Sequence, residues 1–131
     1  MKSSTFLLDT SVLIEYGREL EAGKPGPAHA TLDLVKNQRV YISPVTVAEL
    51  LEGSDDEIAT MQFLAGFQAL TIGWQTAKRC ALNQSRATQR MGENDAWQAA
   101  LAVTGGHTLV GHDRAFERRP WLTYLDYAKA I

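Results

Sequence analysis

The chain has 131 residues, of which 45% are hydrophobic and 21% charged, and its formal net charge is −2. This length suits a single domain, and this composition can supply a compact core. No apolar run approaches the roughly 20 residues that cross a bilayer, and the single cysteine, Cys80, cannot form an internal disulfide. Membrane proteins and secreted disulfide scaffolds are therefore excluded. We expect one cytoplasmic globular domain over residues 1–131.

Short apolar runs alternate with longer amphipathic stretches along the chain. In chain order the pattern predicts a strand at 5–8, helices at 11–20 and 28–37, a strand at 40–42, helices at 45–51, 55–69, 75–91 and 95–104, and a strand at 107–110. Strands that alternate with helices indicate an α/β domain with a mostly parallel central sheet. Ligands of such sheets bind beyond the carboxyl ends of the strands.

Four acidic residues stand where a predicted strand passes into a helix, or near the start of a helix. Asp9 follows the first strand, Glu49 lies one turn into the helix after the second, Asp95 opens an alanine-rich helix, and Asp113 follows the last strand. Clustered carboxylates repel one another unless a cation compensates them, and oxygen ligands suit Mg²⁺ or Mn²⁺. Taken singly, each aspartate is better explained as a helix N-cap or a solvated residue, and Glu49 as a surface residue beside Glu52; the case for a site rests on their combination.

The sequence segments around these acids resemble the motifs of a known protein family. The segments that carry the resemblance are 7–14 (LLDTSVLI), 45–50 (VTVAEL), 92–102 (GENDAWQAALA), 109–113 (LVGHD), 116–118 (FER) and 121–122 (WL). They resemble the motifs of PIN-domain ribonucleases, and particularly those of VapC-type toxins of bacterial toxin–antitoxin pairs. The motifs occur in the family's order, and the resemblance spans essentially the whole chain.

The resemblance implies a three-layer α/β/α fold and a Mg²⁺- or Mn²⁺-dependent endoribonuclease. It implies that Asp9, Asp95 and Asp113 hold the metal, and that Glu49 completes the metal site or orients the attacking water. Thr10 and Ser11 are expected to support the site through hydrogen bonds near Asp9. The chain departs from the family pattern in its last strand, where Gly111 stands in place of a common hydroxyl residue.

Basic residues are concentrated in the second half of the chain, and no acidic residue occurs between Trp74 and Gly92. They could form a phosphate-binding face on a mildly acidic protein, or be ordinary solvated charges. The candidate RNA-contacting residues are Lys78, Arg79, Arg86, Arg90, Arg114, Arg118 and Arg119.

The toxin resemblance also implies protein partners. A cognate VapB-type antitoxin is expected, with apolar positions on helices 11–20 and 55–69 as candidate contacts, although core packing explains the same residues. A homodimer, or a larger toxin–antitoxin assembly, is the family expectation. No membrane partner is expected.

Two other functions fit parts of the pattern. A PIN-like module that binds RNA or protein with weak or no catalysis would be marked by loss of an acid, and all four acids are present. A receiver-like signalling domain would show an acidic pair near its N-terminus, whereas Thr10 follows Asp9. Cys80 lies among alanines and is expected to pack in the core, and His112 is expected to play a surface or supporting role.

Overall fold

The computed structural model describes residues 5–128. Five strands form one sheet in the order β3-β2-β1-β4-β5, and every neighbouring pair is parallel. The strands are β1 (Thr5–Leu8), β2 (Arg39–Ile42), β3 (Gln68–Ala69), β4 (Thr108–Gly111) and β5 (Tyr124–Asp126). The helices are α1 (Thr10–Ala22), α2 (Pro27–Val35), α3 (Pro44–Glu52), α4 (Glu57–Leu64), α5 (Trp74–Arg86), α6 (Glu93–Gly105) and α7 (Arg114–Glu117).

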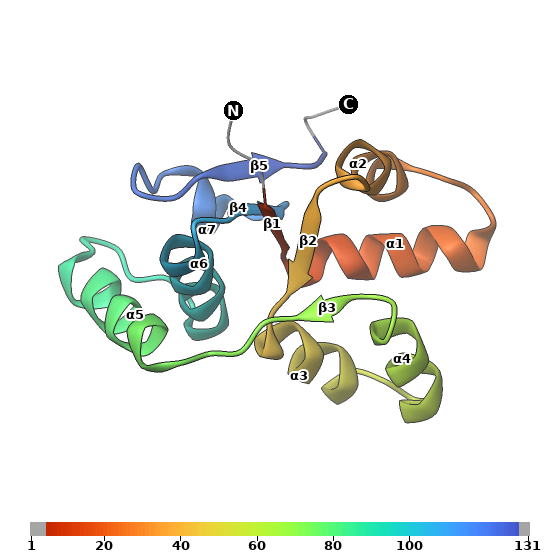
Figure 1. Ribbon diagram of the computed structural model, residues 1–131, viewed down its shortest axis with the longest axis horizontal. Coiled ribbons are helices and arrows are strands. Elements are labelled where there is room, and N and C mark those ends of the chain that lie inside the picture. The colour runs from red at the N-terminus through yellow and green to blue at the C-terminus, as the bar shows by residue number, and fades with distance from the viewer. Residues whose placement is uncertain (1–4, 129–131) are drawn as a thin grey trace.

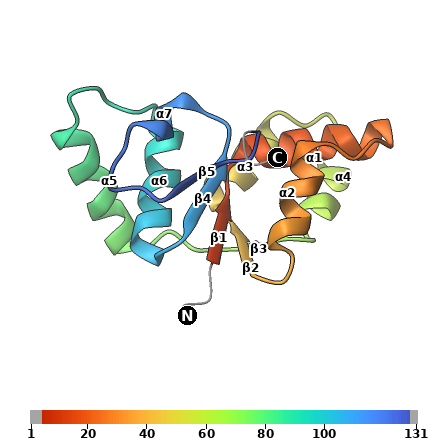
Figure 2. The same ribbon diagram turned by 90° about the horizontal axis from the view of Figure 1, so that it is seen from above.

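Helices cover both faces of the sheet, with α5, α6 and α7 on one side and α1 to α4 on the other (Figures 1 and 2). Successive side chains of a strand point to opposite faces, so the central strands feed two cores. Leu7 and Leu109 pack toward α5 and α6, whereas Leu8 and Val110 pack toward α1. The predicted three-layer α/β/α architecture is confirmed.

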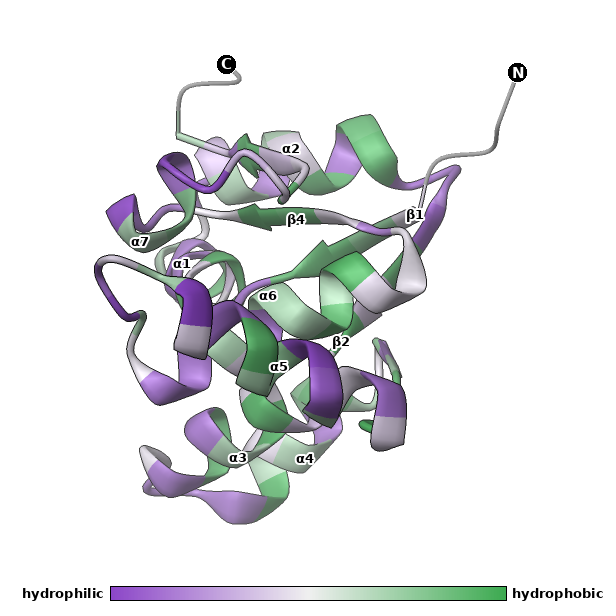
Figure 3. Cartoon of the chain, turned by 90° about the vertical axis from the view of Figure 1, so that its left-hand side faces the viewer, coloured by the Kyte–Doolittle hydropathy of each residue, from purple (hydrophilic) through white to green (hydrophobic). Residues whose placement is uncertain are grey.

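Small side chains bring α6 close to the sheet. Ala99, Ala100 and Ala102 are fully buried, and Cys80 on α5 packs in the same core, as expected. The strands β1 and β4 are hydrophobic, while α5, on the outside of this layer, carries strongly hydrophilic segments (Figure 3). No helix within residues 5–128 is long and apolar enough to cross a membrane.

The helix predicted at 75–91 is shorter than expected, because α5 ends at Arg86. The backbone of Ala87 is already extended, with ψ at 135°. The Gln84 side chain then binds both backbone groups of Met91, accepting from its N–H at 2.9 Å and donating to its carbonyl at 2.8 Å. Met91 is buried, and residues 87–92 form the loop between α5 and α6.

The helix predicted at 55–69 is also too long. Asp56 caps α4 through the N–H of Ala59, and the helix ends at Leu64. Gln68 and Ala69 instead pair with β2, and the N–H of Leu70 donates to Ile42 O at 2.9 Å. The open edge of β2 gains backbone partners in this way, which local helix propensity cannot anticipate.

Two short elements near the C-terminus had no predicted range, although Asp113 was expected at or near the start of a helix. The helix α7 has four residues, too few for a periodic pattern, and β5 has three. Strand β5 pairs with β4 along the other side of the sheet, with Val110 opposite Leu125. Both elements lie beside Asp113 and complete that side of the candidate site.

A buried carboxylate joins α1 to the start of α2. The N-cap residue of α2, Gly26, has no side chain to cap the helix. Glu19 takes this role from α1: its carboxylate accepts from the N–H groups of Gly26, Ala28 and His29 at 3.0, 3.0 and 2.8 Å. A negative charge at a helix N-terminus is favourable, and hydrogen bonds to a charged group are the stronger ones.

We expect Glu19→Gln to lower the free energy of unfolding by about 2 kcal/mol, because an amide cannot accept from all three N–H groups. Chemical denaturation followed by circular dichroism would measure the loss. Glu21→Gln, an exposed change on the same helix, is the control and should stay within about 0.5 kcal/mol of the parent. Equal stability of the two variants would contradict the capping role.

Candidate carboxylate site

The parallel sheet brings the four acidic residues toward one edge. Asp9 directly follows β1, and its N–H donates to Val110 O at 2.8 Å, which extends the pairing of β1 with β4. Asp113 lies two residues beyond the end of β4 and begins α7. Asp95 lies in the first turn of α6. Glu49 comes from α3, the helix that follows β2.

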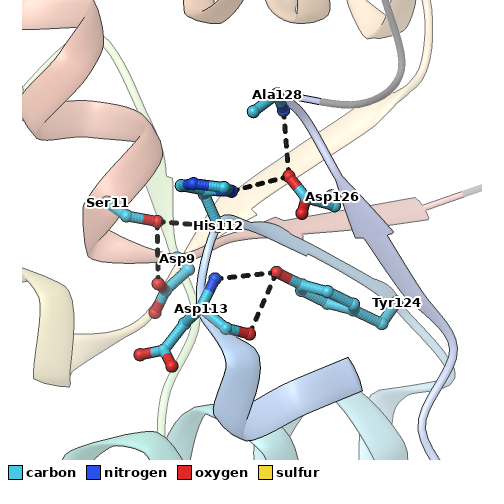
Figure 4. Close-up of polar contacts among 7 residues, drawn as sticks. All are labelled: Asp9, Ser11, His112, Asp113, Tyr124, Asp126 and Ala128. Carbon is cyan, nitrogen blue, oxygen red and sulfur yellow. Dashed lines mark hydrogen bonds and ion pairs between the residues drawn. The ribbon is translucent and has the colours of Figure 1, made fainter. Parts of the chain in front are cut away.

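Asp9 is held from two sides. Ser11 Oγ donates to Asp9 Oδ2 at 3.0 Å, and Gln98 Nε2 approaches Oδ1 at 3.3 Å. Ser11 Oγ in turn accepts from the N–H of His112 at 3.1 Å, which ties α1 to the segment after β4 (Figure 4). Burial raises the pKa of Asp9, while hydrogen bonds from Ser11 act in the opposite direction. The predicted support from Ser11 is thus present as a direct contact.

A buried chain of polar groups connects Asp9 with Glu49. Gln98 Nε2 also donates to Thr46 Oγ1 at 2.7 Å, the Thr46 and Thr10 hydroxyls lie 2.9 Å apart, and Thr10 Oγ1 donates to Glu49 Oε1 at 2.6 Å. Because Thr10 uses its proton on Glu49, the Thr46 hydroxyl donates to Thr10. The Thr10 hydroxyl therefore supports Glu49, while a hydrogen bond from the Thr10 backbone acts on Asp9 and lowers its pKa.

Sequence reasoning missed Gln98. Both N–H groups of its amide are used, on Asp9 and Thr46, and its Oε1 is buried without a hydrogen-bond partner among residues 5–128. A glutamine that is 1% exposed in a helix face otherwise made of alanine and leucine is unusual, because buried polar groups are costly. The signal in the sequence was this polar residue within the run from Ala96 to Ala102.

Asp113 has contacts with two elements. Its carboxylate accepts from the N–H of Ala115 at 2.9 Å, so it also caps α7, as the simpler sequence interpretation predicted. Its own N–H donates to the Tyr124 hydroxyl at 3.0 Å (Figure 4). Burial raises the pKa of Tyr124, so this hydroxyl stays neutral. Tyr124, on the unanticipated strand β5, is a second supporting residue that sequence reasoning missed.

Electrostatic interaction among the acids is strongest at Asp95. Burial first, then the charges of Asp113 and Asp9, a hydrogen bond with Asp113 and the charge of Glu49 raise the pKa of Asp95 to about 7. No lysine, arginine or histidine within residues 5–128 forms an ion pair with any of the four acids. The cluster therefore carries negative charge that the described part of the chain does not neutralise.

The chemistry of these groups fits a hard divalent cation, since all four offer carboxylate oxygens. Within residues 5–128, no three Asp, Glu, His or Cys side chains are already arranged as a complete set of metal ligands. The carboxylates thus interact through their charges without forming a closed cage.

Gly111 lies directly against Asp9. A Cβ atom at position 111 would come within 3.0 Å of Asp9 Cβ and 3.2 Å of Asp9 Oδ2. The space that a side chain would fill is thus occupied by Asp9 itself. The departure from the family pattern at Gly111 has a steric reason in this chain, and Ser11 and Gln98 supply hydrogen bonds to Asp9.

The seven basic candidates do not lie together. Arg90, Arg114, Arg118 and Arg119 line a cleft beside Asp113, which His112 also lines. Lys78, Arg79 and Arg86 lie on α5 and do not line this cleft. The His112 ring is turned toward β5, where Nδ1 lies 2.9 Å from Asp126 Oδ1 (Figure 4).

Comparison with known proteins identifies the fold and the family of the chain. Chains in three solved structures share the fold with a TM-score of 0.75: DNA-bound VapBC from Salmonella typhimurium (24% identity, 95% of this chain and 98% of that chain), VapBC-1 from nontypeable Haemophilus influenzae (23%, 95% and 99%) and FitAcB from Neisseria gonorrhoeae (22%, 95% and 99%). No curated protein sequence matches the chain. A family model described as the PIN domain matches residues 6–122, and the chain therefore belongs to the PIN domain family.

Proposed function

We propose that this protein is a Mg²⁺- or Mn²⁺-dependent endoribonuclease that acts as the VapC-type toxin of a toxin–antitoxin pair. The observation that carries the nuclease proposal is the cluster of four acids: the pKa of Asp95 is raised to about 7, and no basic side chain within residues 5–128 forms an ion pair with any of the four. The toxin proposal is supported by the PIN domain and by the fold shared with chains of VapBC structures.

In this proposal Asp9, Asp95 and Asp113 hold the metal through their carboxylates. The bound cation would supply charge neutralisation at the scissile phosphate and a lowered pKa for the attacking water. Ser11 and Gln98 fix the direction of the Asp9 carboxylate, and Tyr124 holds the backbone at Asp113. These contacts orient the acids before substrate arrives, which reduces the reorganisation needed during the reaction.

Glu49 belongs to the same proposed site in a different role. Thr10 orients one of its oxygens from 2.6 Å, so the carboxylate is held at a fixed place near the other acids. From there it can complete the metal site or accept a hydrogen bond from water. The attack of water on the phosphodiester needs no covalent enzyme intermediate.

A VapB-type antitoxin is the proposed partner. A groove of about 410 Å³ runs between α1, α3 and α4, and its lining includes Ile14, Leu20 and Phe63. Ile14 and Leu20 are 42% and 54% exposed, which leaves apolar surface available on α1. Apolar surface of this kind suits an amphipathic helix of a partner protein. Homodimer formation and a cytoplasmic location are part of the same proposal.

The first test is RNA cleavage. We expect the purified protein, free of any antitoxin, to cleave a mixed RNA substrate with Mg²⁺ or Mn²⁺, and to lose at least about a hundredfold in rate with EDTA or in Asp95→Asn, because charge stabilisation of the transition state depends on the acids. Gel analysis of the products measures the rate. Cleavage that persists in both controls would exclude the metal-dependent mechanism, and a folded parent without activity would favour a binding module.

The same substitution should stabilise the metal-free protein. A carboxyl whose folded pKa is about 7, against an ordinary 3.8, loses stabilisation as the pH rises from about 4 to 7. At pH 8 we expect the free energy of unfolding of Asp95→Asn to exceed that of the parent by about 1 kcal/mol. Solvent screening keeps this difference small, because Asp95 is only partly buried. The difference should shrink at pH 5.

Urea denaturation at the two pH values, in the presence of EDTA, measures this difference. Asp55→Asn is the matched control, because Asp55 is exposed and outside the cluster, and it should show no pH-dependent gain. Added Mg²⁺ should stabilise the parent but not Asp95→Asn. A destabilised Asp95→Asn at pH 8 would show that the acids do not repel one another as proposed.

Gly111→Ala tests the close packing of Gly111 against the Asp9 side chain. The added methyl group would crowd Asp9, so we expect about a tenfold loss of cleavage and a cost of about 1–3 kcal/mol in stability. Gly17→Ala on α1, which meets no atom within 4 Å, should keep full activity and gain up to about 1 kcal/mol. Normal activity of Gly111→Ala would contradict the steric explanation.

A further inference from the structure

A cleft of about 1130 Å³ opens from the carboxylate site. One wall is the loop 88–92 between α5 and α6, and the other is the segment 112–119, which contains α7. Gly92, at the end of the loop, lies close to Asp95, since a Cβ built on it would be 3.8 Å from Asp95 Oδ2. Asp113 lines the cleft itself. The cleft therefore runs directly into the proposed reaction site.

The two walls are fastened together. Gln84 binds the N–H and carbonyl of Met91, and the buried Met91 side chain anchors the loop in the core. Across the cleft, Arg119 Nη2 donates to Gln89 O at 3.0 Å while its Nε donates to Ala115 O at 3.1 Å. One guanidinium thus links α7 to the loop. Besides Met91, residues 88–92 are exposed, so the side chains of Gln84, Met91 and Arg119 fix the position of the loop.

The remaining charges of the cleft are available to a ligand. Arg90, Arg114 and Arg118 are exposed, and no hydrogen bond or ion pair engages their side chains within residues 5–128. Against these cations the lining includes two acids, Asp113 at the reaction site and Glu117. This arrangement contrasts with the overall charge of −2. A positive cleft in a mildly acidic protein attracts an anionic ligand to one place.

We infer that this cleft binds the sugar–phosphate backbone of a single RNA strand beside the scissile bond, with Arg90, Arg114 and Arg118 contacting phosphates and Arg119 positioning the loop. The inference rests on the proposed function for the identity of the strand. An occupant of the cleft must reach Asp113, and a phosphodiester chain can present anions to the arginines and a reacting phosphate to the acids. Guanidinium groups suit phosphate oxygens because they offer paired donors.

Binding can be tested without cleavage in the Asp95→Asn background, using a fluorescent single-stranded oligoribonucleotide over a range of salt concentrations. Adding Arg90→Ala and Arg114→Ala should weaken binding at least about tenfold and reduce the salt slope by about 1.4, since each phosphate contact on a single strand contributes about 0.7. The control adds Lys24→Ala and Arg39→Ala, which remove the same charge outside the cleft. This control should change the affinity by less than about twofold, since surface charges far from a ligand are screened.

Equal losses in both double variants would overturn the inference, because they would show general attraction rather than a site. Unchanged affinity in the arginine variant, in a protein that does cleave RNA, would overturn the cleft while leaving the proposed function intact. Binding that depends on the two arginines, in a protein whose parent form cleaves nothing, would support the cleft and refute the nuclease. Tighter binding of a poly-glutamate peptide than of RNA would overturn the RNA assignment and favour an acidic protein segment.

Two substitutions distinguish a positioning role of Arg119 from a direct contact with phosphate. If Arg119 acts by joining α7 to the loop, both Arg119→Ala and Arg119→Lys should raise hydrogen exchange in residues 87–92 and weaken RNA binding to a similar extent. A lysine keeps the charge but cannot bridge Ala115 O and Gln89 O with a planar fork. Full rescue of binding by Arg119→Lys, with unchanged exchange, would instead show that Arg119 contacts phosphate through its charge.

Discussion

Electrostatic repulsion among Asp9, Glu49, Asp95 and Asp113 is the constraint on which the rest of this structure depends. The parallel pairing of β1 with β4 places Asp9 and Asp113 at the same edge, while α3 brings Glu49 and the first turn of α6 brings Asp95 toward it. Burial, and after it the charges of the neighbouring acids, raise the pKa of Asp95, so its charged form is disfavoured in this arrangement. Because no ion pair within residues 5–128 relieves it, the fold must hold the acids by burial, backbone pairing and hydrogen bonds.

Those hydrogen bonds form a support that is particular to this chain. Gly111 leaves room for Asp9, and Gln98 and Ser11 donate to the two Asp9 oxygens. Gln98 also donates to the Thr46 hydroxyl, so a substitution of Gln98 on α6 would alter the hydrogen bonding of Thr46 on α3. A buried amide with one unpartnered oxygen is a costly way to fill a core, and its contact with Asp9 offers a functional reason for it.

The same edge of the sheet combines charges of both signs in a fixed order. Asp9 and Asp113 follow the ends of β1 and β4, and the cleft arginines lie on the loop after α5 and on the segment around α7. Arg119 and Gln84 hold these two segments in place through backbone oxygen and nitrogen atoms. In the proposed function, an RNA strand lying in this cleft would pass from the arginines to the carboxylates.

From the sequence by itself we could predict the PIN-like α/β fold and the three central strands, and name the four acids as candidate site residues, because apolar periodicity and short motifs are local signals. It also indicated the support from Ser11. Only the tertiary structure decided where α5 ends, and that β3 pairs with β2 and β5 with β4. It also decided that Gln98 lies beside Asp9 and Tyr124 beside Asp113. Likewise it separated Arg90 and Arg114 from the basic residues of α5. These features depend on contacts between residues far apart in the chain, such as Gln98 with Asp9, and no local pattern encodes which distant partner a buried polar group will meet.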